Sequence, residues 1–273
     1  MLRVILAALI TCSTLAFPVH ADEINVSGST SVARVMDVLA EHYNNQQKQT
    51  FIAVHGTDST SGIMLVKKGI SDIAMSSRYL TEGEKDEDLK IETLALDGIA
   101  VIINIKNPVK VLSRKQLFEI YKGTITNWKQ VGGPDKQIAV VTREASSGSR
   151  YSFETLLGLT KVVKDKLVST MSQNALVANS NGMVKTLVSN NPQAIGFISY
   201  GSVDMSVNSL MIDDIEATSD NIANRRYPLT RPFLILHYPE KDSASVKAFL
   251  SYLKSQEAQR LILDYGYVPM TQK

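Results

Sequence analysis

The sequence has a single cysteine among 273 residues, and it lies near the start of the chain. Residues 1–21 have the order of an export signal: a basic residue, an apolar run too short to span a bilayer, and small residues before a cleavage point. We expect cleavage after Ala21, which removes Cys12. A mature chain without cysteine has no disulfide, no thiolate metal site and no cysteine nucleophile.

Neither sign of charge is in large excess. Lysine and arginine number 29 against 27 acidic residues, and without Arg3 the balance is 28 to 27, a net charge of +1. A nearly neutral chain argues against nucleic-acid binding or bulk membrane binding, so any anion site has to be local. The sequence also has only one tryptophan, Trp128, which we expect to pack in a core. After residue 21, no segment is long and apolar enough to be a membrane span.

Signatures of catalysis and of metal binding are also missing. His42, His55 and His237 lack metal-ligand spacing, and the sequence has neither a Gly-x-Ser-x-Gly elbow nor a Walker A loop. Ser251 and Lys254 match Ser-x-x-Lys, but they lie in an amphipathic terminal segment without the other hydrolase motifs. We therefore expect no catalytic residue, no metal ligand and no cofactor.

The strongest positive signal is the stretch 142–150, Thr-Arg-Glu-Ala-Ser-Ser-Gly-Ser-Arg, between an apolar strand and a segment of helical periodicity. A hydroxyl-rich turn at a helix start offers free backbone N–H groups and the positive end of the helix dipole. Arg143 can add two parallel hydrogen bonds to an oxyanion. The pattern predicts a site for a small tetrahedral anion, and the alternative is a serine N-cap without a ligand.

Three earlier strands end in the same way. The strand at 24–27 leads to Gly-Ser-Thr-Ser at 28–31, the strand at 51–55 leads to the turn at 56–62, and the strand at 73–75 ends in Ser76-Ser77-Arg78. The first two of these turns precede helices. In open α/β sheets the ligand crevice lies at the carboxyl ends of the strands, so capping alone is a poor explanation of all three turns.

Two long extended segments divide the chain. Residues 94–105 form a nearly continuous β-type run, and residues 227–237 form a second one with two prolines. If both cross between lobes, residues 22–98 with 232–273 form lobe 1, and residues 99–231 form lobe 2. The expected fold is a two-lobe α/β binder with its hinge at the two crossings.

These motifs, taken in order, resemble the short type of phosphate-binding component of bacterial phosphate ABC transporters, over essentially all of the mature chain. The resemblance implies a type II periplasmic binding protein-like fold, a periplasmic location, a monomer, inorganic phosphate as ligand and the membrane permease of an ABC importer as partner. It also implies that the anion is held without water by hydroxyls, backbone N–H groups and arginine. The motifs are those at 28–31, 59–62, 76–78, 143–149 and 195–198 and the closing Leu-Asp-Tyr-Gly-Tyr-Val-Pro at 263–269.

The resemblance places the phosphate ligands on both lobes. One departure concerns Ser77, because better-known relatives have an aspartate there that accepts the phosphate proton and so rejects sulfate. Asp58 is our preferred substitute, with Asp97 and Glu144 left open, and Arg78 is either a second cation or part of an ordinary salt bridge. The expected ligand residues are Ser29, Thr30, Ser31, Asp58, Ser59, Thr60, Ser77, Arg78, Arg143, Ser147, Gly148 and Ser149.

Three other functions remain open from the sequence. The same fold could bind sulfate or molybdate, it could hydrolyse phosphoesters, or it could serve adhesion or sensing. Turnover of a phosphoester would identify the hydrolase, and competition with sulfate would identify the other oxyanion binder.

Overall fold

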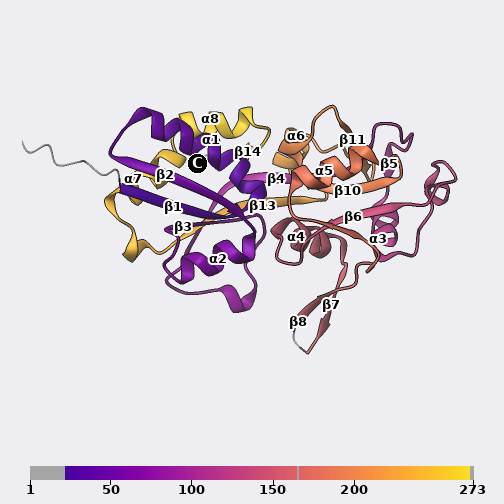
Figure 1. Cartoon of the computed structure of the whole chain (residues 1–273), viewed down its shortest axis with the longest axis horizontal. Helices are drawn as coiled ribbons and strands as arrows, with labels where there is room; N and C mark the ends of the chain where they lie inside the picture. Colours follow the sequence, from indigo (N-terminus) through magenta and orange to yellow (C-terminus); the bar gives the residue numbers. More distant parts are fainter. Residues whose placement is uncertain (1–21, 165, 271–273) are drawn as a thin grey trace, which may run out of the picture.

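The computed structural model describes residues 22–164 and 166–270. The predicted export signal lies outside the described residues. Within them, no helix combines the length and the apolar composition that crossing a bilayer requires. Figure 1 shows two lobes side by side, with strands β4 and β13 running between them. The α/β fold class expected from the sequence is confirmed.

Lobe 1 combines the two ends of the chain, which appear in indigo and yellow in Figure 1. Its first three strands are parallel, with β1 in the middle, and helices connect them. The helix expected after the first hydroxyl turn is present as α1, and its apolar residues Val32, Val35, Met36 and Leu39 are fully buried. The elements are β1 (Asp22–Ser29), α1 (Thr30–Gln46), β2 (Thr50–Thr57), α2 (Ser59–Lys67), β3 (Ile73–Ser76), η1 (Glu82–Glu84), η4 (Pro239–Lys241), α7 (Ala244–Leu253), α8 (Gln256–Asp264) and β14 (Val268–Pro269).

Lobe 2 is formed by the middle of the chain. Trp128 is fully buried in its core, and the indole Nε1 donates to the carbonyl of Gln193 at 2.9 Å. The hairpin β7–β8 projects from this lobe (Figure 1). The elements are β5 (Val111–Leu112), α3 (Arg114–Lys122), η2 (Trp128–Val131), β6 (Ala139–Arg143), α4 (Gly148–Leu157), β7 (Thr160–Val163), β8 (Lys166–Ser169), β9 (Leu176–Ala178), α5 (Asn181–Asn190), β10 (Ala194–Ser199), η3 (Tyr200–Ser202), β11 (Val207–Ser209), β12 (Met211–Ile212) and α6 (Ser219–Ala223).

The two crossings are the strands β4 (Lys90–Asn104) and β13 (Thr230–His237). The first part of β4, up to Gly98, pairs with β13, and the part from Ile99 onward pairs with β10. A single curled sheet therefore runs through both lobes in the order β2-β1-β3-β13-β4-β10-β6-β9.

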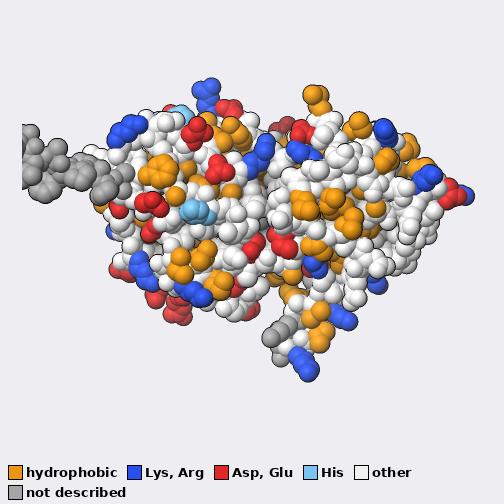
Figure 2. Space-filling model, in the orientation of Figure 1, with side chains coloured by type: hydrophobic (Ala, Val, Ile, Leu, Met, Phe, Trp, Pro, Cys, Tyr) orange, Lys and Arg blue, Asp and Glu red, His pale blue; other side chains and the backbone are white. Residues whose placement is uncertain are grey.

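The hydrophobic residues form separate cores on either side of these crossings. One large core consists of residues between Ile99 and Leu229. Another consists of residues up to Ala95 together with residues from Phe233 onward. We call the two parts lobe 1 and lobe 2, and their exact boundaries stay a prediction. On the face seen in Figure 2, acidic and basic side chains are interspersed, and neither sign of charge dominates.

Candidate functional site

Four helices begin at the junction of the two lobes. The residues that meet there lie in the first turns of their helices: Ser31 of α1, Ser59 of α2, Ser149 of α4 and Asn181 of α5. The sequence pattern had placed the hydroxyl turns before the helices, but the helices begin inside them, because serine and aspartate caps satisfy the first free N–H groups. Four positive dipole ends therefore point toward one place, which suits an anion. The caps are Ser29, Asp58, Ser147 and Ser180.

The hydroxyls of lobe 1 form a buried chain. Ser29 Oγ donates to Ser77 Oγ at 2.8 Å, and the backbone N–H of Ser77 donates to Ser59 Oγ at 3.1 Å. Each of these three serines is at most 3% exposed. The ends of β1 and β3 and the start of α2 therefore present their hydroxyls together, as the strand-end argument predicted.

Lobe 2 completes this group of hydroxyls. Ser31 Oγ and Ser149 Oγ lie 3.0 Å apart, and Asn181 Nδ2 donates to Ser31 Oγ at 3.0 Å. Ser152 Oγ donates to the carbonyl of Ser77 at 3.1 Å. We name this set the hydroxyl cluster: Ser29, Ser31, Ser59, Ser77 and Ser149.

Glycines allow the close approach of the backbones. A Cβ on Gly148 would lie 2.1 Å from Ser59 Oγ and 2.6 Å from Ser77 Oγ, so only glycine fits against lobe 1 here. Within lobe 1, a Cβ on Gly62 would lie 2.5 Å from the Cα of Gly28, and this contact seats the start of α2 directly on β1.

Arg143 reaches the cluster from the end of β6 and is 1% exposed. Glu144 holds its guanidinium through Nε at 2.9 Å and Nη2 at 2.7 Å. Nη2 also donates to the carbonyl of Asn179 at 3.2 Å. Two longer contacts reach toward the lobe junction: Nη1 is 3.5 Å from Asn181 Oδ1, and Nη2 is 3.4 Å from Thr30 Oγ1. The carboxylate of Glu144 thus orients the guanidinium of Arg143, and Nη1 and Nη2 also reach toward the junction of the two lobes.

Arg78 lies apart from the cluster, in an ion pair. Its two terminal nitrogens contact the carboxylate of Glu84 at 2.7 and 2.6 Å, and Nη2 also donates to Thr60 Oγ1 at 3.0 Å. Burial would raise the pKa of Glu84, but the hydrogen bonds from Arg78 and from the Thr81 backbone keep that pKa below its usual value. Arg78 also lies over the ring of Tyr151. Of the two interpretations of Arg78, the structure favours the salt bridge.

Thr60 and Ser147 were also expected to bind the ligand, and the hydroxyl of each forms a hydrogen bond with another part of the chain. Thr60 Oγ1 donates to the carbonyl of Ser146 at 3.1 Å, which links the lobes at the edge of the cluster. Ser147 Oγ accepts from the backbone N–H of Arg150 as the cap of α4. Ser147 therefore shapes the turn that presents Gly148 and Ser149.

Sequence reasoning missed one buried cation, Arg231 on β13. It is 2% exposed, and its Nη1 donates to Ser149 Oγ at 2.7 Å. Its Nε donates to Asp97 Oδ2 at 2.9 Å, on the paired strand β4. A charged residue directly before the apolar stretch Pro232–Leu236 was the available signal, because a charge in a buried strand requires a partner. Asn181 and Ser152 were missed as well.

None of the three candidate proton acceptors is free to face the cluster. Asp58, our preferred one, was expected to point into the cleft, but its two carboxylate oxygens accept from the N–H and the hydroxyl of Ser61, inside its own turn. Glu144 is paired with Arg143. Asp97 is paired with Arg231, and burial raises its pKa against the opposing effect of that partner. Helix capping thus engages the carboxylate of Asp58, and its role as the acceptor of the phosphate proton stays a prediction.

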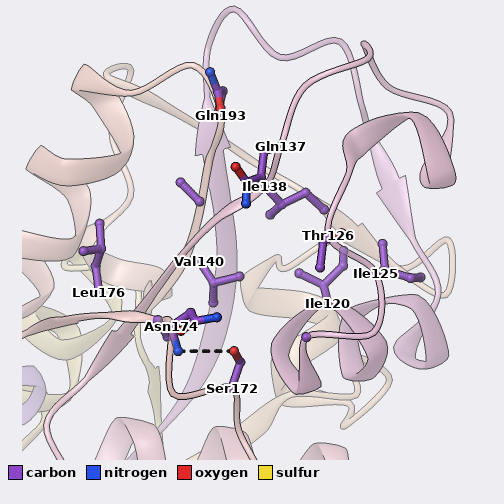
Figure 3. Close-up of a pocket in the computed structure, with 13 residues that line it drawn as sticks. Ile120, Ile125, Thr126, Gln137, Ile138, Val140, Ser172, Asn174, Leu176 and Gln193 are labelled. Atoms are coloured by element: carbon purple, nitrogen blue, oxygen red, sulfur yellow. Dashed lines mark hydrogen bonds between the residues drawn. The ribbon is translucent and has the colours of Figure 1, made fainter.

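A separate cavity of about 300 Å³ lies in lobe 2, away from the cluster (Figure 3). Ile125, Ile138 and Val140 line it together with uncharged polar residues such as Gln137 and Asn174, and none of its lining residues is charged. This composition does not suit a small anion. Among the described residues, no group of three or more His, Cys, Asp or Glu side chains could hold a metal ion.

Known proteins resemble this chain over most of its length. A family model described as a PBP superfamily domain matches residues 18–257. The phosphate-binding protein PstS of Borreliella burgdorferi is 30% identical over 249 residues, covering 90% of this chain and 89% of that protein, and PstS of Bacillus subtilis is 30% identical over 254 residues, covering 91% and 81%.

Solved structures give closer matches. An ABC-type phosphate transport receptor from Vibrio cholerae is 58% identical with a TM-score of 0.78, and the match covers 90% of this chain and all of that one. A putative phosphate ABC transporter substrate-binding protein from Clostridium perfringens, solved with bound phosphate, is 36% identical with a TM-score of 0.86, covering 92% of this chain and all of that one.

Proposed function

The chain belongs to the PBP superfamily, and we propose that it is a solute-binding receptor that captures inorganic phosphate between its lobes and delivers it to an ABC-type importer. One observation carries the proposal: buried hydroxyls at the starts of helices from both lobes meet beside the buried Arg143. Hydroxyls, backbone N–H groups and a guanidinium together can replace the water around a tetrahedral anion.

Binding requires the lobes to move. Ser31 Oγ and Ser149 Oγ contact each other directly at 3.0 Å, so a phosphate ion enters only if the lobes first separate. Hydroxyls act both as donors and as acceptors, so each Ser–Ser hydrogen bond can be exchanged for a bond to a phosphate oxygen. We propose Ser31, Ser59 and Ser77 as the lobe 1 ligands and Arg143, Gly148 and Ser149 as the lobe 2 ligands, with Ser29 and Thr30 beside them. The strands β4 and β13 serve as the hinge.

Calorimetry of the mature chain with phosphate, sulfate and molybdate tests this function. We expect one phosphate bound per chain, with tighter binding than for the other two anions. Tighter binding of sulfate or molybdate would replace phosphate with the other oxyanion. Turnover of a phosphoester would favour the hydrolase, whose expected nucleophile would be one of the serines of the hydroxyl cluster. The relatives are named as binding proteins and transport receptors, which supports a receptor over an enzyme.

The contacts of Asp58 give a prediction about selectivity. Asparagine is also a good N-cap, so Asp58→Asn keeps the bond to the Ser61 N–H, removes the charge and replaces the oxygen that accepts from the Ser61 hydroxyl with an amide NH2. We therefore expect the ratio of phosphate to sulfate affinity, measured by calorimetry, to stay the same as in wild type. A relaxed rejection of sulfate in this variant would restore Asp58 as the acceptor of the phosphate proton. Glu144→Gln provides the parallel test for the carboxylate beside Arg143.

We further propose that the receptor is a periplasmic monomer and that its partner is the permease of the importer. Export requires the segment 1–21, whose charged and apolar order predicts cleavage after Ala21. Mass spectrometry of the periplasmic protein is expected to give an N-terminus at Asp22 or within a residue or two of it. A lipid-modified Cys12 at the N-terminus would instead indicate a membrane-anchored receptor.

A further inference from the structure

The side chain of Arg231 connects three parts of the molecule. It originates on the crossing strand β13, and its Nη1 reaches Ser149 Oγ at the start of α4 at 2.7 Å and lies 3.5 Å from the carbonyl of Ser77 at the end of β3. Both serines belong to the hydroxyl cluster. The guanidinium therefore lies at the point where the hinge, lobe 1 and lobe 2 meet, although it is 82 residues from Ser149 in the sequence.

Asp97 holds one edge of this guanidinium. Nε and Nη2 both lie near Asp97 Oδ2, at 2.9 and 2.8 Å, and Asp97 Oδ1 accepts from Ser199 Oγ at 2.9 Å and from the Tyr200 N–H at 3.2 Å. Because the guanidinium is planar, the edge opposite Asp97 presents Nη1 and the second hydrogen of Nη2. That edge is the one that contacts Ser149.

The guanidinium retains unused donor capacity. Nη2 is buried and, despite its short distance to Asp97, makes no hydrogen bond of proper direction within the described residues. Burial lowers the pKa of Arg231, Asp97 opposes this, and the positive charge of Arg143 adds to the lowering. Two buried guanidiniums thus act on one another beside the cluster, an arrangement that an anion between them would stabilise.

We propose that Arg231 is a second anion-contacting arginine, which Asp97 orients so that its free edge meets the ligand together with Ser149. The proposal rests on the proposed oxyanion-binding function and deepens it. It assigns the second cation of the site to Arg231 and leaves Arg78 in its pair with Glu84. Arg231 offers only donors, so it strengthens binding of phosphate and sulfate alike and does not select between them.

A simpler role would be to brace the crossing strands through the Asp97–Arg231 pair. Replacing both partners separates the two roles, because removing a buried pair together avoids an unpaired buried charge. The test variant is Asp97→Asn with Arg231→Met, in which asparagine keeps an acceptor for Ser199 and Tyr200. Arg114→Gln is the control, since it also removes one arginine from an ion pair, on the exposed Arg114–Asp213 contact.

The affinity of each protein for phosphate, sulfate and molybdate is measured by calorimetry. Small-angle X-ray scattering then measures the compactness of each protein when it is saturated with the anion. We expect the double variant to bind phosphate and sulfate each at least about tenfold more weakly, as the loss of a charge-assisted hydrogen bond predicts. Their affinity ratio should stay unchanged, and the saturated variant should be as compact as wild type. Arg231→Lys should bind more weakly than wild type, and Arg114→Gln should bind as wild type does.

A folded double variant with wild-type affinity would overturn the proposal and leave the pair as a brace. If the double variant does not fold, wild-type affinity in a folded Arg231→Lys would overturn it as well. Failure of the proposed function would instead be seen in the anion binding of the wild-type protein. If wild type binds sulfate or molybdate in place of phosphate, phosphate is wrong, and Arg231 is judged on the anion that binds. Binding of none of the three anions by wild type would overturn both proposals.

Discussion

Replacing Arg143 with alanine is expected to weaken phosphate binding by about 2–5 kcal/mol, the range found when one partner of a buried, hydrogen-bonded charge pair is truncated. The guanidinium is 1% exposed and held by Glu144, so it is already oriented before the ligand arrives. Its loss also leaves Glu144 without its partner. Arg143→Lys should recover only part of the affinity, because an ammonium group lacks the planar fork. Calorimetric titration with phosphate measures both effects.

The control for Arg143→Ala is Arg114→Ala, which removes an exposed arginine of the same lobe and should leave phosphate affinity unchanged. Unchanged affinity in Arg143→Ala itself would contradict the assignment. The principal cation would then be Arg231, or else Arg78 after release from Glu84.

Much of the fold was predictable because the spacing of apolar residues along the sequence indicates which face of a helix or strand is buried. Helix α1 has its apolar residues at helical spacing, and the crossing expected at 94–105 was found as β4 over Lys90–Asn104. The hairpin β7–β8 was not predicted. Its Val162, Val163 and Leu167 are exposed, so no buried face imposed an alternating pattern on its sequence.

The site was predictable only as far as local sequence determines it. Hydroxyl turns at strand ends are local, and the structure brings Ser31, Ser59, Ser77 and Ser149 together as expected. Arg231 was missed because its role depends on Ser149, whose position relative to it is set by the fold of both lobes. The capping role of Asp58 was not predicted, although its place directly before a helix indicates it: its side chain accepts from the backbone N–H of Ser61.

A methyl group at position 148 is expected to keep the lobes apart. In Gly148→Ala the new Cβ would lie 2.1 Å from Ser59 Oγ and 3.0 Å from Ser59 Cβ, so lobe 1 has to move away from the start of α4. Adding a methyl group to a tightly packed contact costs about 1–3 kcal/mol. In Gly148→Ala this cost destabilises only the closed arrangement of the two lobes. We therefore expect weaker phosphate binding and less compaction at saturating phosphate, measured by calorimetry and small-angle X-ray scattering.

Gly182→Ala is the matched control for this prediction. Gly182 also lies in the first turn of a lobe 2 helix, α5, but the nearest atom to its new Cβ, Ser180 Oγ, would be 3.9 Å away. Alanine also favours the helix in both variants, so a difference between them reports the contact with lobe 1 and not helix stability. If Gly148→Ala binds phosphate and compacts as Gly182→Ala does, the lobes do not approach each other at Gly148 when phosphate is bound, and the hydroxyls of lobe 1 reach the anion from farther away.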